Sequence, residues 1–166
     1  MILPFDTLKS CKLAELSGLV TSTPKKRLDS LCLFDFILYQ ESELPFVHGI
    51  YAFFDTTGEK CLYVGRVLGP QFIERVPAHF AIGNGSRYNQ FLRAHKESND
   101  FLNLADAAIS ARSCQFLLMP MPHALIRRAE ELLILLLAPN YNKRIPRNTL
   151  GSHDLPSTDF ETALLS

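Results

Sequence analysis

Several features are absent from this 166-residue sequence, and each absence excludes a class of protein. There is no run of about 18 apolar residues, so no membrane-spanning helix is predicted. The first residues, MILPFDTLKSCK, lack the basic start and the long apolar stretch of a secretory signal. We therefore expect a cytoplasmic protein that does not associate with membranes.

The four cysteines form no recognisable motif. They lie far apart, with no C-x-x-C pair and no histidine at zinc-binding spacing. Neither a zinc site nor a redox motif is therefore indicated. We expect reduced and mostly packed thiols at Cys11, Cys32, Cys61 and Cys114.

The chain also lacks net charge, since 17 basic residues balance 17 acidic ones. A zero net charge argues against a protein that wraps nucleic acid by bulk electrostatics. The charges are unevenly distributed, however, because segment 66–96 holds five basic residues and one acidic residue, and a second basic cluster follows at 143–147. Such clusters are often a solvated surface, but two of them also fit a groove that follows a phosphate backbone. The residues assigned to this groove are Arg66, Arg87, Arg93, Lys96, Lys143 and Arg144.

What is present indicates one folded unit, because 47% of the residues are apolar and 20% are charged, as in soluble globular domains. We expect an α/β (α+β) fold with a small three-stranded, mostly antiparallel sheet flanked by helices. The core domain would span residues 48–147, between a helical extension over 1–47 that packs on it and a mobile or loosely docked tail over 148–166. Within the extension, Thr23-Pro24 is typical of a helix start and predicts a helix over 24–40.

From Gly49 the hydrophobic period becomes that of strands. Segments 49–54 and 61–65, separated by the turn sequence DTTGEK, predict a β-hairpin. If the turn is centred on Thr57, Tyr51 lies directly opposite Tyr63, and both point to the same face of the sheet. Two phenols would then project side by side.

Three further elements are predicted after the hairpin. A helix begins after Gly69-Pro70, and it carries Arg75 and His79 four residues apart on one face. Residues 113–122 predict a strand, and residues 124–138 predict a strongly apolar helix that ends at Pro139.

The last predicted helix carries two adjacent carboxylates on different faces. Glu130 lies on the apolar stripe, whereas Glu131 is aligned with two arginines one turn before it. A carboxylate on a buried stripe is unfavourable unless a cation or a hydrogen-bond donor meets it. Glu130 is therefore the best candidate metal ligand, and a buried ion pair with Arg75 is the alternative.

In this order, these residues resemble the GIY-YIG nuclease family. The match consists of Gly49-Ile50-Tyr51, Tyr63-Val64-Gly65, Arg75 with His79-Phe80, and Glu130 followed by Leu133-Ile134, Pro139 and Tyr141-Asn142. Either tripeptide alone is a weak signal, but the joint order is specific. Two departures occur: Val64 replaces an isoleucine, and Pro77 lies inside the predicted helix, where a proline costs about 3 kcal/mol.

The resemblance implies a divalent-metal-dependent endonuclease that hydrolyses DNA. Its catalytic residues would be Tyr51, Tyr63, Arg75, His79, Glu130 and Asn142. Tyr51 would be the general base, and Glu130 would bind one Mg²⁺ or Mn²⁺. His79 would take or stabilise the proton of Tyr51, because a phenol is a poor base near neutral pH. Asn142 would brace the site.

Two alternatives remain open at the level of the sequence. One is a catalytically silent nucleic-acid-binding or protein-interaction module of the same fold, and the other is an RNase. A homodimer is one means by which such a small nuclease would recognise a particular DNA sequence.

Overall fold

The computed structural model describes residues 1–32, 35, 48–69, 71–82, 89–143 and 157–165. Within these residues, four strands form one open sheet in the order β1-β4-β2-β3, and each neighbouring pair is antiparallel. The strands are β1 (Lys26–Arg27), β2 (Gly49–Phe54), β3 (Cys61–Val67) and β4 (Gln115–Pro120). The predicted α+β class with an antiparallel sheet is confirmed, and the short strand β1 is an addition to the three expected strands.

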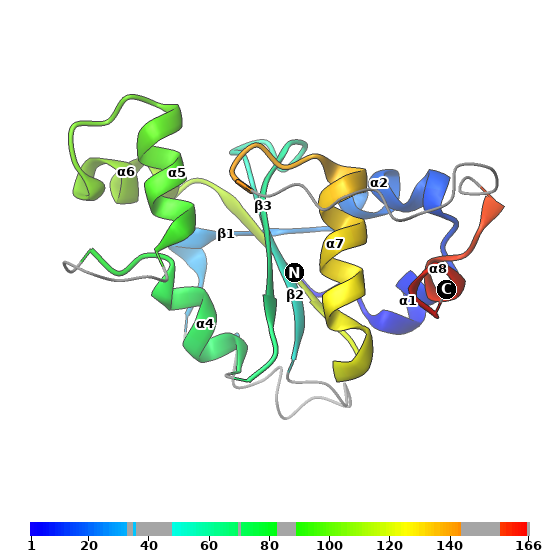
Figure 1. The fold of residues 1–166 in the computed structure, drawn as a ribbon. Helices are drawn as coiled ribbons and strands as arrows, with labels where there is room; N and C mark the ends of the chain where they lie inside the picture. Colours follow the sequence, from blue (N-terminus) through cyan, green and yellow to red (C-terminus); the bar gives the residue numbers. More distant parts are fainter. Residues whose placement is uncertain (33–34, 36–47, 70, 83–88, 144–156, 166) are drawn as a thin grey trace.

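Helices cover both faces of this sheet (Figure 1). Strand β2 is buried along its whole length because β3 and β4 flank it and helices lie above and below it, which explains its continuous apolar run. The helices are α1 (Phe5–Lys9), α2 (Leu13–Ser22), α4 (Phe72–Ala78), α5 (Gln90–Ser98), α6 (Leu104–Ala111), α7 (Ile126–Leu137) and α8 (Phe160–Leu165), with 3-10 turns η1 (Leu28–Ser30) and η2 (His123–Leu125). No helix in the described part of the chain is long and apolar enough to cross a membrane.

Each face of the sheet has its own hydrophobic core. Ile50, Ala52 and Phe54 belong to one core cluster together with residues of α7, α1, α2 and α8. The alternate residues Tyr51 and Phe53 belong to a second cluster together with residues of α4, α5 and α6. This alternation follows from the two-residue repeat of a strand, and it places the two candidate tyrosines on the α4/α5 side.

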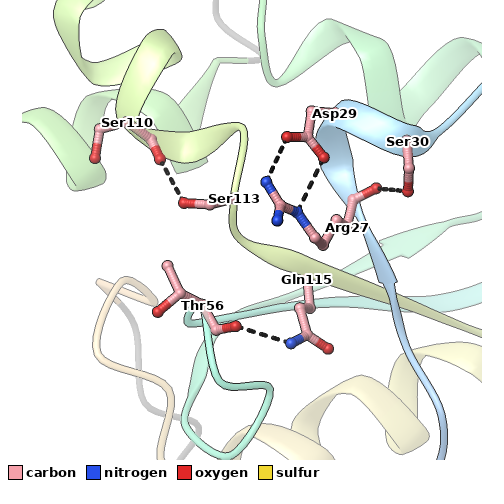
Figure 2. A network of polar contacts seen from close by, with 7 residues as sticks. All are labelled: Arg27, Asp29, Ser30, Thr56, Ser110, Ser113 and Gln115. Carbon is pink, nitrogen blue, oxygen red and sulfur yellow. Dashed lines mark hydrogen bonds and ion pairs between the residues drawn. The ribbon is translucent and has the colours of Figure 1, made fainter.

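The helix predicted over 24–40 does not form over 24–32, where the chain has strand β1 and the 3-10 turn η1, although Asp35 is helical. The helix lies earlier, as α2, and Thr23 follows its end, where the Thr23 hydroxyl donates to the Leu19 carbonyl at 2.7 Å. Residues 26–27 instead pair with β4, and the Arg27 guanidinium donates two hydrogen bonds to the Asp29 carboxylate (Figure 2). Residues 26–27 prefer the strand to a helix because pairing with β4 gives their backbone N–H and C=O groups hydrogen-bond partners. The first N–H groups of a new helix would have no such partners. Residues 33–34 and 36–40 lie outside the described residues.

The hairpin forms, but its register differs by two residues from the prediction. Tyr51 lies opposite Gly65, and Phe53 lies opposite Tyr63. The turn is organised by the Asp55 carboxylate, which accepts from the N–H groups of Gly58, Glu59 and Lys60, and a bulge follows Phe53. The turn is also tied to β4, because the Gln115 side chain donates to the Thr56 carbonyl at 2.9 Å (Figure 2). A shift of two residues keeps every side chain on its face, so both phenols still share one side.

The end of the C-terminal tail is not loosely docked. Phe160, Ala163 and Leu164 of α8 form a buried stripe in the core that α1, α2 and α7 share. The Phe160 N–H donates to the Cys11 carbonyl at 2.8 Å, so the start of α8 is joined to the turn between α1 and α2. The stripe has the i, i+3, i+4 spacing of an amphipathic helix, which buries such a face wherever an apolar surface is available. Residues 144–156 lie outside the described residues.

Candidate active site

Tyr51 and Tyr63 lie side by side, with ring centroids 6.3 Å apart. Both rings are buried, Tyr51 on the central strand β2 and Tyr63 on the edge strand β3. The phenol of Tyr51 lies over Gly65, and a Cβ built at Gly65 would be 2.4 Å from the Tyr51 Cζ and hydroxyl oxygen. The glycine of the second tripeptide therefore provides the space for the first tyrosine.

We expect Gly65→Ala to destabilise the protein by about 2 kcal/mol or more, because the methyl group must displace a packed ring. For a chain of this size that loss lowers Tm by about 4–8 °C. Thermal unfolding followed by circular dichroism measures it. Gly69→Ala is the matched control, since nothing lies within 4 Å of a Cβ at Gly69. Equal Tm values for the two variants would contradict the tight contact between Gly65 and Tyr51.

His79 contacts Tyr51 directly. Its Nε2 lies 2.5 Å from the Tyr51 hydroxyl oxygen, and its Nδ1 accepts the backbone N–H of Phe91 at 3.3 Å. Burial, with a smaller contribution from Arg75, lowers the pKa of His79 to about 3, so the ring is neutral at working pH. A neutral imidazole that accepts at Nδ1 carries its proton on Nε2, and we assign this tautomer.

This tautomer changes the role expected for His79. The sequence indicated a residue that takes or stabilises the proton of Tyr51, whereas the assigned ring donates a hydrogen bond from Nε2 to the phenol oxygen. A donor at this position stabilises the phenolate form of Tyr51 and does not remove its proton. With this tautomer Nε2 cannot accept the proton of Tyr51, whereas the position of His79 beside Tyr51 is as expected.

Pro77 does not prevent this contact. Helix α4 ends just after the proline, and the next N–H groups bond at shorter range, from His79 to the Val76 carbonyl at 3.2 Å and from Phe80 to the Pro77 carbonyl at 2.9 Å. A tightened last turn is a usual helix ending, so the missing N–H of the proline falls where the helix stops. His79 is thereby turned inward and is fully buried.

The two tyrosines are difficult to ionise. Burial raises the pKa of Tyr51 well above its ordinary value of about 10, the neighbouring Tyr63 adds to the effect, and the Arg75 guanidinium opposes it. Burial also raises the pKa of Tyr63, and the charge of the Arg75 guanidinium again opposes this rise. The Tyr63 hydroxyl donates to Gln90 Oε1 at 3.0 Å. Arg75 thus lies where it favours the negative form of either phenol.

Glu130 pairs with Arg66, not with Arg75. Its carboxylate receives a hydrogen bond from the Arg66 guanidinium, and its side chain is 17% exposed. Burial raises the pKa of Glu130, and the charge of Arg66 opposes this rise. Helix α7 covers the face opposite the tyrosines, yet the Glu130 carboxylate raises the pKa of both phenols. Glu130 therefore lies within electrostatic range of both phenols across the edge strand β3.

The Glu130 carboxylate is a type of ligand that a hard divalent cation accepts. The described residues contain no group of three or more His, Cys, Asp or Glu side chains that could bind a metal. Mg²⁺ and Mn²⁺ accept one carboxylate and take their other ligands from water and phosphate, whereas zinc sites use three or four protein ligands. Arg66 already provides a positive charge at the Glu130 carboxylate, where a metal ion would bind.

Asn142 braces the edge strand. Its side-chain oxygen accepts the Val64 N–H at 2.9 Å, and its amide donates to the Val64 carbonyl at 2.8 Å. The preceding Tyr141 N–H donates to the Leu62 carbonyl at 2.8 Å. These bonds replace part of a neighbouring strand, so Tyr63 is held between two fixed residues.

Four of the six basic residues assigned to a groove lie within the described residues. Arg93 and Lys96 lie on α5, with Arg93 exposed, and Arg66 is bound to Glu130. Lys143 lies 3.4 Å from Glu97 in an exposed pair, which contributes little to stability. Arg87 and Arg144 lie outside the described residues.

Gln90 and Phe91 both contact the site, but the sequence did not indicate either of them as a site residue. Phe91 acts through its backbone N–H, which has no sequence signature. Gln90 is one of many polar residues near helix starts, so its contact with Tyr63 depends on the packing of α5 against β3.

Three comparisons with known proteins found no relative of this chain. No protein-family model, no curated protein and no solved structure matches the chain. The candidate site is therefore defined by the contacts among its own residues.

Proposed function

We propose that this protein is a divalent-metal-dependent endonuclease that hydrolyses DNA, with a site similar to that of GIY-YIG nucleases. The observation that carries the proposal is the buried contact of 2.5 Å between Tyr51 and His79, beside Arg75 and within electrostatic range of Glu130. Buried polar side chains with perturbed pKa values are typical of catalytic sites. The proposal includes a cytoplasmic location and allows for a homodimer.

In this mechanism, Tyr51 takes the proton of the attacking water. His79 Nε2–H and the Arg75 guanidinium favour the phenolate that this step requires. Arg75 also suits the non-bridging oxygens of a phosphate, because its planar group donates several hydrogen bonds. Tyr63 orients the reacting groups, and Asn142 fixes the strand that carries Tyr63.

Glu130 would hold the metal ion, Mg²⁺ or Mn²⁺. When bound, the metal supplies positive charge at the phosphate and at the departing oxygen. Arg66 would then be released from Glu130 and would become free to contact the phosphate backbone. Arg93 and Lys96 would extend this basic surface along α5.

Because Arg66 and the metal compete for one carboxylate, Arg66→Gln should tighten metal binding while it weakens binding of DNA. We expect the Kd for Mn²⁺ to fall by roughly tenfold at pH 7.5, since the metal no longer displaces a cation that shares Glu130. Isothermal titration with Mn²⁺ in the absence of DNA measures this change. Arg93→Gln is the control, and it should leave the Kd for Mn²⁺ unchanged. An unchanged Kd in Arg66→Gln would contradict a metal site at Glu130.

The proposed activity is tested by nicking of supercoiled plasmid with Mg²⁺, with Mn²⁺ and with EDTA. Metal-dependent conversion to open circles supports the nuclease. Binding without cleavage in any metal would favour the silent nucleic-acid-binding module. Faster cleavage of RNA than of DNA at equal salt would indicate an RNase, since RNA differs at the 2′-hydroxyl.

A further inference from the structure

A second buried histidine, His95 on α5, lies outside the catalytic contacts described above. Its Nδ1 is 3.0 Å from the Tyr141 hydroxyl oxygen, and its Nε2 is 3.2 Å from the Ser110 hydroxyl. The Asn99 amide donates to the same Tyr141 oxygen at 3.3 Å. The Asn99 amide, which can only donate, also lies 3.4 Å from His95 Nδ1, so we assign Nδ1 as the acceptor. In this tautomer Tyr141 donates its proton to His95 Nδ1, and the neutral ring donates from Nε2 to Ser110. The four side chains form one hydrogen-bonded chain with a single direction.

Tyr141 joins this hydrogen-bonded chain to the edge strand β3. Tyr141 donates its backbone N–H to the Leu62 carbonyl, and the adjacent Asn142 bonds both backbone groups of Val64. Tyr63 lies between Leu62 and Val64. Whatever holds Tyr141 in place thus also holds the strand segment that carries Tyr63.

His95 joins the same hydrogen-bonded chain to the first turn of α5. The His95 ring stacks on the Phe91 ring, with centroids 5.8 Å apart and planes 12° apart. The Phe91 N–H donates to His79 Nδ1, and Gln90 accepts the hydroxyl of Tyr63. The first turn of α5 therefore makes two of the contacts that orient the site.

We propose that His95 and Tyr141 are a pair of positioning residues, which hold α5 against strand β3 and thereby fix the hydrogen bond between His79 and Tyr51. The effect on turnover rests on the proposed function, whereas the effect on His79 does not. Neither residue touches the reacting atoms. Each acts through the backbone to which it is bound.

The first measurement is the ¹⁵N spectrum of the His79 ring, which distinguishes its two tautomers. In the wild type we expect a single form with the proton on Nε2. Tyr141→Phe removes one hydroxyl and keeps the ring, and it should give a mixture of tautomers or a broadened His79 signal. His95→Leu should behave in the same way, whereas His95→Asn keeps an acceptor near the Nδ1 position and should restore the wild-type signal. A wild-type His79 spectrum in both folded Tyr141→Phe and folded His95→Leu would overturn the proposal.

Asn103→Ala is the control for effects that arise from loss of stability alone. Asn103 caps α6 by accepting the Asp106 N–H at 2.9 Å, so its loss lowers Tm, and its side chain contacts none of the four side chains of the hydrogen-bonded chain. This variant should leave the His79 spectrum unchanged. If Asn103→Ala changes the His79 spectrum as Tyr141→Phe does, the spectrum responds to loss of stability in general. The proposed positioning role of His95 and Tyr141 is then excluded.

The second measurement is cleavage of plasmid DNA at saturating Mg²⁺. Tyr141→Phe should lower kcat by about 10-fold to 10²-fold and change KM by less than about twofold, because misorientation affects the chemical step more than binding. A change in KM alone would contradict positioning of the catalytic groups. If the wild type does not cleave DNA while the His79 spectrum still responds to Tyr141→Phe, the nuclease function fails and the positioning pair stands.

Discussion

Glu130→Gln should abolish Mg²⁺-dependent cleavage, whereas Glu131→Gln should leave most of it. Glu130 is the partly buried carboxylate that already binds a cationic side chain, and its charge reaches both phenols of the site. A neutral amide is a much weaker ligand for a hard cation, so the stabilisation that the metal gives to the transition state is lost. We expect a decrease in rate of about 10³-fold or more, equivalent to about 4 kcal/mol.

Single-turnover cleavage of plasmid DNA over a range of Mg²⁺ concentrations measures this loss. Glu131→Gln is the matched control because it changes the same functional group on the next residue of α7. Glu130→Gln also leaves Arg66 without its carboxylate, so Tm of both variants is compared with that of the wild type. Equal losses of activity in the two variants, or full activity in Glu130→Gln, would remove Glu130 from the mechanism.

The second large effect is expected for Tyr51→Phe, which should lower turnover by about 10²-fold to 10⁴-fold, the usual range for a positioned acid or base. Only a hydroxyl is removed, and the ring can stay over Gly65, so the fold and the affinity for DNA should change little. Filter binding in Ca²⁺ measures the affinity, and single-turnover cleavage in Mg²⁺ measures the rate. A variant that cleaves at the wild-type rate would show that Tyr51 is not the base.

The pH dependence separates Tyr51 from His79. The pKa of Tyr51 is raised well above about 10, so its active phenolate form is rare at neutral pH and increases about tenfold with each pH unit. The wild-type rate should therefore rise steadily from pH 6 to pH 9 or so. No inflection is expected near pH 6.5, because the pKa of His79 is lowered to about 3 and the ring stays neutral throughout. Tyr51→Phe should flatten the rise, and an inflection that disappears in His79→Ala would contradict the assigned tautomer.

Much of the candidate site could be predicted from local sequence because its geometry depends on short repeats. The two tyrosines remained on one face although the register differed by two residues, since strand side chains alternate with a period of two. Arg75 and His79 stayed near one another because α4 continues almost to His79 despite Pro77. The candidate role of Asn142 as a brace agrees with its two bonds to Val64.

The partners of these residues could not be predicted in the same way. Arg66 and Glu130 are 64 positions apart, and nothing in the sequence favours Arg66 over Arg75 as the cation at this carboxylate. Similarly, the N–H that fixes the His79 tautomer belongs to Phe91, and its direction depends on where α5 begins.

The sequence by itself determined the antiparallel hairpin, the apolar helix α7 and the faces on which Tyr51, Tyr63 and Glu130 lie, because each depends on the periodicity of one element. The tertiary structure decided the pairing of residues 26–27 with β4, the docking of α8 against α1, the ion pair of Glu130 and the direction of the hydrogen bond between His79 and Tyr51. These features join segments that are distant along the chain. Burial and hydrogen bonding of both partners then outweigh the local preference of either segment.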